Sequence, residues 1–167
     1  MRPFGTQDAA FILALLNDPD WIRYIGDKNV RSLADAAGYL ERSPLAMYRE
    51  HGLGLMLVQT RDSGEAVGMC GLIRRANLPH VDLGFAFLPA HRGKGYAREA
   101  AAAMLDHGHR HHRIARIVAI ATPANARSID VLRAIGMRDA GAVQLAGDDE
   151  TLALFASEAP LTDKETP

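Results

Sequence analysis

Residues 83–101, LGFAFLPAHRGKGYAREAA, join an apolar strand to an alanine-rich helix through a bend that contains two glycines. The first amides of a helix have no acceptor within it, and the helix dipole adds partial positive charge at the same end. Gly93 and Gly95 let an anion approach the backbone, while Arg92 and Lys94 add mobile positive charge. The bend therefore predicts a phosphate site. The alternative is that both glycines serve only a tight turn.

Two familiar phosphate-binding motifs do not match this bend. The Walker P-loop requires Gly-Lys followed by Ser or Thr, whereas Lys94 is followed by Gly95. The Rossmann fingerprint places three glycines at the opening of a helix, whereas Tyr96 and Ala97 follow Gly95 here. A nucleoside triphosphatase and a dinucleotide-dependent dehydrogenase are therefore not favoured.

The pattern outward from the bend predicts helices first, then strands, then alternating strands and helices. Helical spacing predicts helices over 7–17, 21–25, 32–51, 96–112 and 125–135. Apolar runs between turn signals predict strands over 55–58, 66–74, 81–88, 114–121, 137–143 and 151–155. Ser43-Pro44 must break or kink the third helix. The buried stripe of the fourth helix is expected to contain Ala97, Ala101, Met104 and Gly108.

This order of elements predicts the α/β (α+β) class, with one mixed, mostly antiparallel sheet in a single domain over residues 2–156. Residues 157–167 are expected to form a frayed tail. The chain has 167 residues, 48% of them hydrophobic, and a formal net charge of −1. That charge argues against a nucleic-acid partner, and no apolar run is long enough to span a membrane. The single cysteine, Cys70, favours a cytoplasmic location and a core position.

Two blocks of the sequence resemble motifs of one enzyme superfamily. Arg92-Gly93-Lys94-Gly95-Tyr96-Ala97 matches Gln/Arg-x-x-Gly-x-Gly/Ala, which is motif A of the GNAT acetyltransferases. Residues 125–137 resemble the later Asn-x-x-Ser and Leu-x-x-x-Gly-Phe segment of that family, with Met137 in place of Phe. The opening, Arg2-Pro3-Phe4, is similar to the branch of ribosomal-protein N-terminal acetyltransferases. The resemblance spans residues 2–156.

The resemblance implies a fold, a cosubstrate and a set of binding residues. It implies a sheet whose central strands splay apart, with helices on both faces, and acetyl-CoA as the cosubstrate. The diphosphate would bind the amides of residues 92–97, and the pantetheine arm would bind the backbone of Phe87 and Leu88. Asn125 would hydrogen-bond the pantetheine, and Ser128 would face the sulfur. An amine acceptor is implied as the second substrate.

The expected reaction requires a proton acceptor, because an alkylamine attacks a thioester only as its free base. Asp82, at the start of the third strand, is the candidate, with His80 two residues back on the same strand face. Desolvation would raise the pKa of Asp82. The alternatives are a solvated charge at the strand end for Asp82 and a turn residue for His80.

Other catalytic roles are less well defined by the sequence. An amide near Ala86 or Phe87 is expected to bind the oxyanion. Val131 occupies the place where many family members carry a tyrosine acid, so Ser128 or Tyr96 remains as the acid candidate. For Ser128 the alternative is a helix cap. These departures favour direct attack by the amine.

The acceptor and the assembly stay open at this point. The acceptor is a protein N-terminus or a small amine, bound between Trp21, Tyr24 and Tyr39 and the loops 77–80 and 147–150. Asp148, Asp149 and Glu150 are expected either to draw a cationic acceptor or to be solvated. His107 and His111 have zinc-like spacing without further ligands, so we expect no metal. The alternative function is a non-catalytic acetyl-CoA sensor, and the chain is expected to be a monomer or homodimer.

Overall fold

The computed structural model describes residues 1–145 and 150–159, which form one seven-stranded sheet in the order β1-β2-β3-β4-β5-β7-β6. The strands are β1 (Arg2–Pro3), β2 (Leu55–Gln59), β3 (Ala66–Ile73), β4 (Val81–Phe87), β5 (Arg116–Ala121), β6 (Arg138–Gln144) and β7 (Thr151–Glu158). Only β4 and β5 pair in parallel; the other neighbours are antiparallel. The predicted mixed sheet is confirmed.

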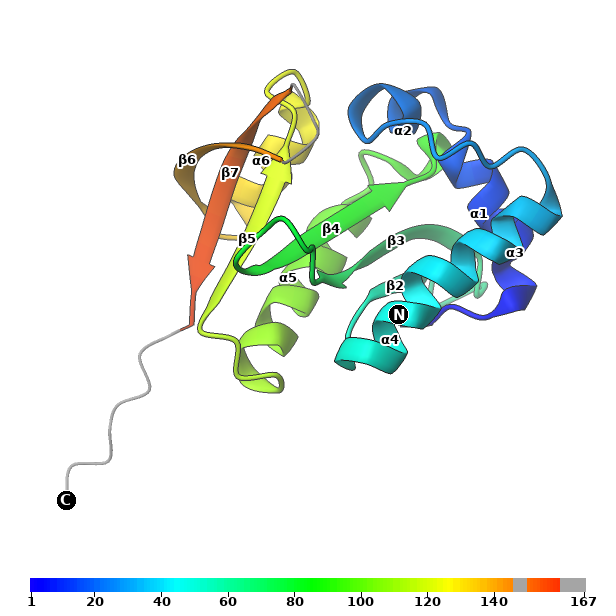
Figure 1. The fold of residues 1–167 in the computed structure, drawn as a ribbon, viewed down its shortest axis with the longest axis horizontal. Helices are drawn as coiled ribbons and strands as arrows, with labels where there is room; N and C mark the ends of the chain where they lie inside the picture. Colours follow the sequence, from blue (N-terminus) through cyan, green and yellow to red (C-terminus); the bar gives the residue numbers. More distant parts are fainter. Residues whose placement is uncertain (146–149, 160–167) are drawn as a thin grey trace.

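Helices cover both faces of the sheet (Figure 1). They are α1 (Ala9–Leu16), α2 (Pro19–Tyr24), α3 (Leu33–Leu40), α4 (Ala46–His51), α5 (Tyr96–Arg110) and α6 (Ala126–Ala134). One core lies between α1–α3 and the β2–β3 face, and a second lies between α5, α6 and the opposite face. No helix in the described ranges is long and apolar enough to cross a bilayer.

The central strands β4 and β5 separate soon after they meet. Their pairing is limited to Val81 with Ile117 and Asp82 with Val118. Beyond these positions the two strands diverge, as Figure 1 shows between the green and yellow arrows. The sheet therefore has a V-shaped opening at its centre, and Asp82 is the last residue of β4 that pairs with β5.

Two predicted elements gain detail in the structure. Ser43-Pro44 lies in a π-helical segment, Glu41–Leu45, which interrupts the predicted third helix between α3 and α4. Proline lacks an amide hydrogen and cannot make the regular helical bond. Strand β7 continues to Glu158, which pairs with Arg116, so it extends beyond the predicted strand end at 155. Residues 160–167 of the expected tail lie outside the described residues.

Close packing of α5 on the sheet fixes the position of the bend that precedes this helix. Ala101, Met104 and Gly108 are buried as predicted, whereas Ala97 is only partly buried. A Cβ added to Gly108 would lie 2.6 Å from a methyl of Ile117. The small residue therefore allows the helix to approach β5.

Gly108→Val is expected to lower the free energy of unfolding by about 1–3 kcal/mol, because the added side chain overpacks the contact with β5. Ala103→Val is the matched control, since Ala103 is exposed on the same helix. Thermal or denaturant unfolding measures the difference. An equal loss in both variants would contradict the close-packing role of Gly108.

Candidate active site

The bend before α5 presents a row of unpaired backbone donors. Gly93 and Gly95 have φ values of +74° and +86°, which turn the chain into the helix. In the described part of the chain, the amides of residues 93–98 donate to no protein acceptor, whereas the Arg92 amide donates to the Pro89 carbonyl at 3.3 Å. A Cβ placed on Gly95 would meet nothing within 4 Å. The bend therefore fits an anionic group that needs several amide donors.

The edge of β4 that faces the opening is formed by alternate residues. The Leu88 amide donates to the Val67 carbonyl at 3.0 Å, so Leu88 is directed toward β3. Because the direction of backbone groups alternates along an antiparallel strand, Ala86 also faces β3 while Phe85 and Phe87 face the opening. Both backbone groups of Leu88, expected to bind the pantetheine arm, are engaged within the protein, because its carbonyl also accepts the His91 amide at 2.9 Å. The backbone of Phe85 faces the opening instead. Of the two expected oxyanion donors, the amides of Ala86 and Phe87, that of Phe87 faces the opening.

Arg92 is held in place by protein groups. Its Nε donates to the Phe87 carbonyl at 2.8 Å, one terminal nitrogen pairs with Asp20 at 2.6 Å, and the other pairs with Asp18. The expectation of mobile positive charge at Arg92 is therefore wrong, because two carboxylates neutralise its guanidinium. The Lys94 side chain is exposed and contributes to neither cavity described below.

Asp18 connects the bend to helix α2. Its side chain is only 4% exposed and also accepts the Trp21 amide at 3.2 Å, which caps α2. Through Arg92, the same carboxylate fixes α2 against the glycine bend. Trp21 and Tyr24 of α2 line the adjoining cavities. The position of the helical wall therefore depends on an ion pair with the bend.

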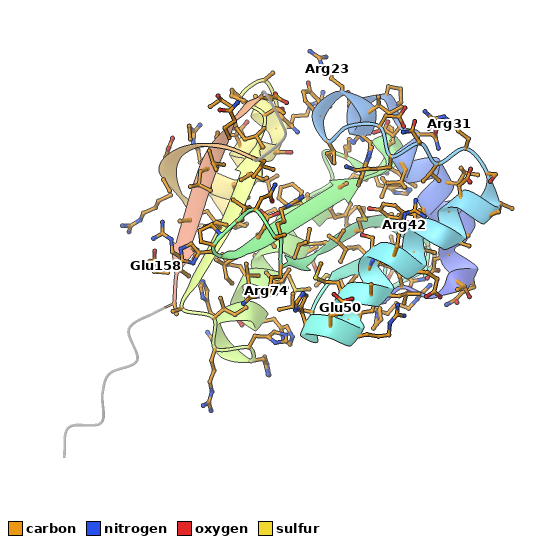
Figure 2. The ribbon with its side chains drawn as sticks, in the orientation of Figure 1. Arg23, Arg31, Arg42, Glu50, Arg74 and Glu158 are labelled. Atoms are coloured by element: carbon orange, nitrogen blue, oxygen red, sulfur yellow. The ribbon has the colours of Figure 1, made fainter. Side chains whose placement is uncertain are left out.

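Two cavities meet in the opening of the sheet. The larger one, of about 1030 Å³, contains the glycine bend, and the smaller one, of about 470 Å³, contains Asp82. Residues that line both cavities are Trp21, Tyr24, Ile25, Phe85, Asn125 and Ser128. The two spaces are therefore continuous. Figure 2 shows the side chains that project from α2, β4 and α6 in this region.

The smaller cavity contains two buried oxygen atoms without partners. Asp82 is 1% exposed; its Oδ2 accepts from Arg75 Nε at 2.6 Å, and its Oδ1 meets no donor with hydrogen-bond geometry among the described residues. Burial raises the pKa of Asp82 above its ordinary value, whereas the Arg75 guanidinium and, more weakly, the nearby Ile120 backbone oppose the shift without cancelling it. Thr122 is 5% exposed, and its Oγ1 also has no partner there. Unsatisfied buried polar atoms are rare, and here both line the same cavity.

Asn125 and Ser128 lie where the cavities join. The cap of α6 is Asn125, whose Oδ1 accepts the Ser128 amide at 3.2 Å, so the alternative that Ser128 is the cap is wrong. The Ser128 hydroxyl has no recorded partner within the described ranges and lines both cavities. Asn125 keeps its amide nitrogen available. Both residues therefore lie at the junction of the two cavities.

Several other candidates lie elsewhere. His80 is exposed, and none of residues 77–80 lines either cavity, so this loop does not form the acceptor wall. Glu150 lines neither cavity, and Asp148 and Asp149 lie outside the described residues. Cys70 is fully buried in β3, and burial raises the pKa of its thiol to about 12, which confirms the core position.

The histidine cluster of α5 is engaged in contacts with itself and with β7. The rings of His107 and His111 lie 4.6 Å apart, and His109 contacts the Ser157 hydroxyl at 3.0 Å. Among the described residues, no three His, Cys, Asp or Glu side chains gather in a way that suits a metal ion. Val131 lines the larger cavity and offers no proton donor there.

Sequence reasoning missed Arg75, Thr122 and Phe85. Arg75 follows β3 in the chain, and the pairing of Ile73 with Asp82 brings it beside the carboxylate. The outward direction of the Phe85 backbone follows from the pairing of β4 with β3, which the sequence does not reveal. Thr122, after the end of β5, gave no signal in the sequence.

A splayed α/β sheet with an uncapped glycine bend and a buried carboxylate defines an acyltransferase of the coenzyme A-dependent class. Residues 1–138 match the family model described as an acetyltransferase (GNAT) domain. The chain is 42% identical over 141 residues to the uncharacterized N-acetyltransferase YnaD of Bacillus subtilis, covering 84% of this chain and 79% of that protein. It is 32% identical to the uncharacterized protein YkkB of the same organism, covering 82% and 80%. The chain belongs to the GNAT acetyltransferase family, and acetyl-CoA is its cosubstrate.

Solved structures share this fold across different branches of the family. A ribosomal-protein-S5-alanine acetyltransferase from Vibrio fischeri aligns with a TM-score of 0.72 at 19% identity, covering 99% of this chain and 94% of that one. A spermidine N-acetyltransferase from Vibrio cholerae aligns with a TM-score of 0.77 at 16% identity, covering 95% and 94%. At these identities the likeness shows the fold alone, so the ribosomal-protein branch is one among several.

Gly95→Ala is expected to weaken CoA binding about tenfold or more, because the new Cβ enters the space that the diphosphate oxygens need. Gly64→Ala is the matched control: its φ of +70° gives the same backbone strain, and it lies in the β2–β3 turn away from both cavities. Calorimetric titration with CoA measures both. Equal affinities in the two variants would contradict the placement of the diphosphate on the bend.

Arg92→Gln and Asp18→Asn are expected to lower the free energy of unfolding non-additively, with a coupling of about 1–3 kcal/mol in a double-mutant cycle. Asparagine retains the helix cap, so the cycle isolates the buried ion pair. Asp20→Asn is the control, because its half-exposed pair contributes about 0–1 kcal/mol. CoA affinity should fall only modestly, since backbone amides hold the diphosphate. Additive losses would contradict the proposed link between the bend and α2.

Proposed function

We propose that this chain acetylates the primary amine of an acceptor bound in the smaller cavity, by direct attack of the amine on the acetyl thioester. The observation that carries the proposal is the buried, unpartnered Oδ1 of Asp82 beside the junction of the two cavities. Bound acetyl-CoA supplies the activated acetyl group. The residues of this chain bind the two reactants, exclude water and accept the proton.

The bend and the strand edge orient the cosubstrate. The free amides of residues 93–97 hold the diphosphate, and the outward groups of Phe85 and Phe87 continue the sheet along the pantetheine arm. The Phe87 carbonyl is already used by Arg92, which leaves its amide as the donor on that residue. Asn125 lines the same space and binds the pantetheine through its side-chain nitrogen. On this proposal the thioester lies at the cavity junction.

Asp82 accepts the proton of the amine, directly or through a water molecule. Its raised pKa, caused by burial, makes it a better base than an exposed carboxylate, whose ordinary pKa is near 4. The Arg75 guanidinium stabilises the ionised form of this carboxyl and so lowers its pKa, against the effect of burial. Thr122 provides a second acceptor for an amine hydrogen through its free Oγ1.

The Phe87 amide stabilises the oxyanion, and Ser128 donates to the leaving thiolate. The Phe87 amide points into the opening because the backbone groups of its neighbours, Ala86 and Leu88, are directed toward β3. Ser128 has a hydroxyl at the junction without a competing recorded partner in the described chain. Val131 offers no proton at the place where other family members carry tyrosine.

The function itself is tested by incubating the protein with acetyl-CoA and a broad panel of amines, with mass detection of acetylated products and of released thiol. We expect transfer to at least one primary amine. CoA binding without transfer to any member of the panel would contradict the enzyme and favour a sensor.

Asp82→Asn is expected to lower kcat about a hundredfold or more, because general base catalysis contributes about 10²–10⁴. In the parent protein, kcat/KM should rise with pH through the raised pKa of Asp82, since only the carboxylate accepts a proton. This rise of kcat/KM with pH should be missing in Asp82→Asn. The rise due to deprotonation of the amine substrate should appear in both proteins. Unchanged CoA affinity confirms folding of the variant, and identical pH profiles would contradict the role of Asp82.

A further inference from the structure

The charged residues of the smaller cavity are mostly basic. Its lining contains Lys28, Arg42 and Arg75 but a single acid, Asp82, and this acid is already paired with Arg75. Neither Lys28 nor Arg42 forms an ion pair with any residue in the described ranges. The described lining of this cavity therefore carries a surplus of positive charge.

Arg75 has an unused hydrogen-bonding edge. Only its Nε donates to Asp82, and no described residue accepts from its two terminal nitrogens. Its side chain is 37% exposed, so that edge is accessible. A guanidinium carries five N–H donors and binds a carboxylate or phosphate with two parallel bonds. Arg75 can therefore hold Asp82 and an external anion together.

Arg42 lies on the opposite, helical wall, in the π-helical segment after α3 (Figure 2). Its guanidinium carbon lies 5.8 Å from the centre of the Tyr39 ring, which also lines the cavity. Asp35, which interacts with Arg42 electrostatically, is exposed and does not line the cavity. The positive charge of Arg42 therefore remains available to an occupant of the cavity.

We infer that the acceptor is a small primary amine that also carries an anionic group, a carboxylate or a phosphate, bound by Arg75, Arg42 and Lys28. This inference rests on the proposed function. The cavity of about 470 Å³ suits a small molecule. A polycationic acceptor would meet three positive charges and be repelled. The same charges disfavour the ammonium form of the amine and so favour its reactive free base.

The first test compares acceptors that share a carbon skeleton and differ in charge. These are 4-(aminomethyl)benzoate, its neutral carboxamide and the corresponding xylylenediamine, with O-phosphoethanolamine against ethanolamine to separate phosphate from carboxylate recognition. We expect kcat/KM to be at least about tenfold higher for an anionic member than for its neutral partner, and lowest for the diamine. Preference for the neutral amines or the diamine would overturn the inference and leave the transferase function intact.

The second test uses Arg42→Gln and Lys28→Gln, because neither residue touches Asp82. Each should raise KM for the preferred anionic acceptor about tenfold, with little change in KM for its neutral partner. Arg74→Gln is the control, since Arg74 is exposed beside Arg75 and lines neither cavity. Equal KM values in parent and variants would overturn the anion site. CoA binding without transfer to any acceptor would instead contradict the proposed function itself.

Discussion

The separation of β4 and β5 after Asp82 and Val118 is the constraint on which the rest of the structure depends. Strands that part inside a sheet leave two edges whose amides and carbonyls need partners. On β4 these groups belong to Phe85 and to the Phe87 amide, since the Phe87 carbonyl already accepts from Arg92. On the proposed function, the extended arm of the cosubstrate satisfies them as an added strand would. The opening also leaves the Asp82 Oδ1 buried without a hydrogen bond among the described residues. One topological feature thus produces both the free strand edge and the buried carboxylate.

Contacts around this opening hold its walls in position. Below the opening, β4 and β5 are held by their short parallel pairing and by α5, which approaches closely at Gly108. Above it, Arg92 joins the bend to Asp18 and Asp20 of the helical layer, 74 and 72 residues earlier in the chain. A guanidinium that is expected from its motif to face phosphate instead fixes the wall of the site. The phosphate-binding capacity then resides in backbone amides, whose geometry does not depend on a mobile side chain.

The order of elements and the bend could be predicted from the sequence, because both depend on local signals. Gly93 and Gly95 adopt the positive φ values that the turn requires, and Asp82, predicted at the start of a strand beside the cleft, lines the smaller cavity. What could not be predicted depends on tertiary pairing. The roles of Leu88 and Ala86 depend on which strand edge is occupied by β3, and the partners of Arg92 depend on the docking of α2. Arg75 was missed because its importance follows from the register of Ile73 with Asp82.

On the proposed function, Arg75 takes part both in binding the acceptor and in setting the pKa of Asp82. The pKa of Asp82 is set by burial, which raises it, and by the Arg75 guanidinium, which lowers it. On the proposed acceptor, an anionic group at the free edge of Arg75 offsets part of the positive field at Asp82. The pKa of Asp82 then rises further, and the carboxylate becomes a stronger base when the amine is in place. A neutral amine leaves the field of Arg75 intact and meets a weaker base. On this proposal Arg75 affects both the affinity for the acceptor and the rate of proton transfer, because it lies between the acceptor's anionic group and the Asp82 carboxylate.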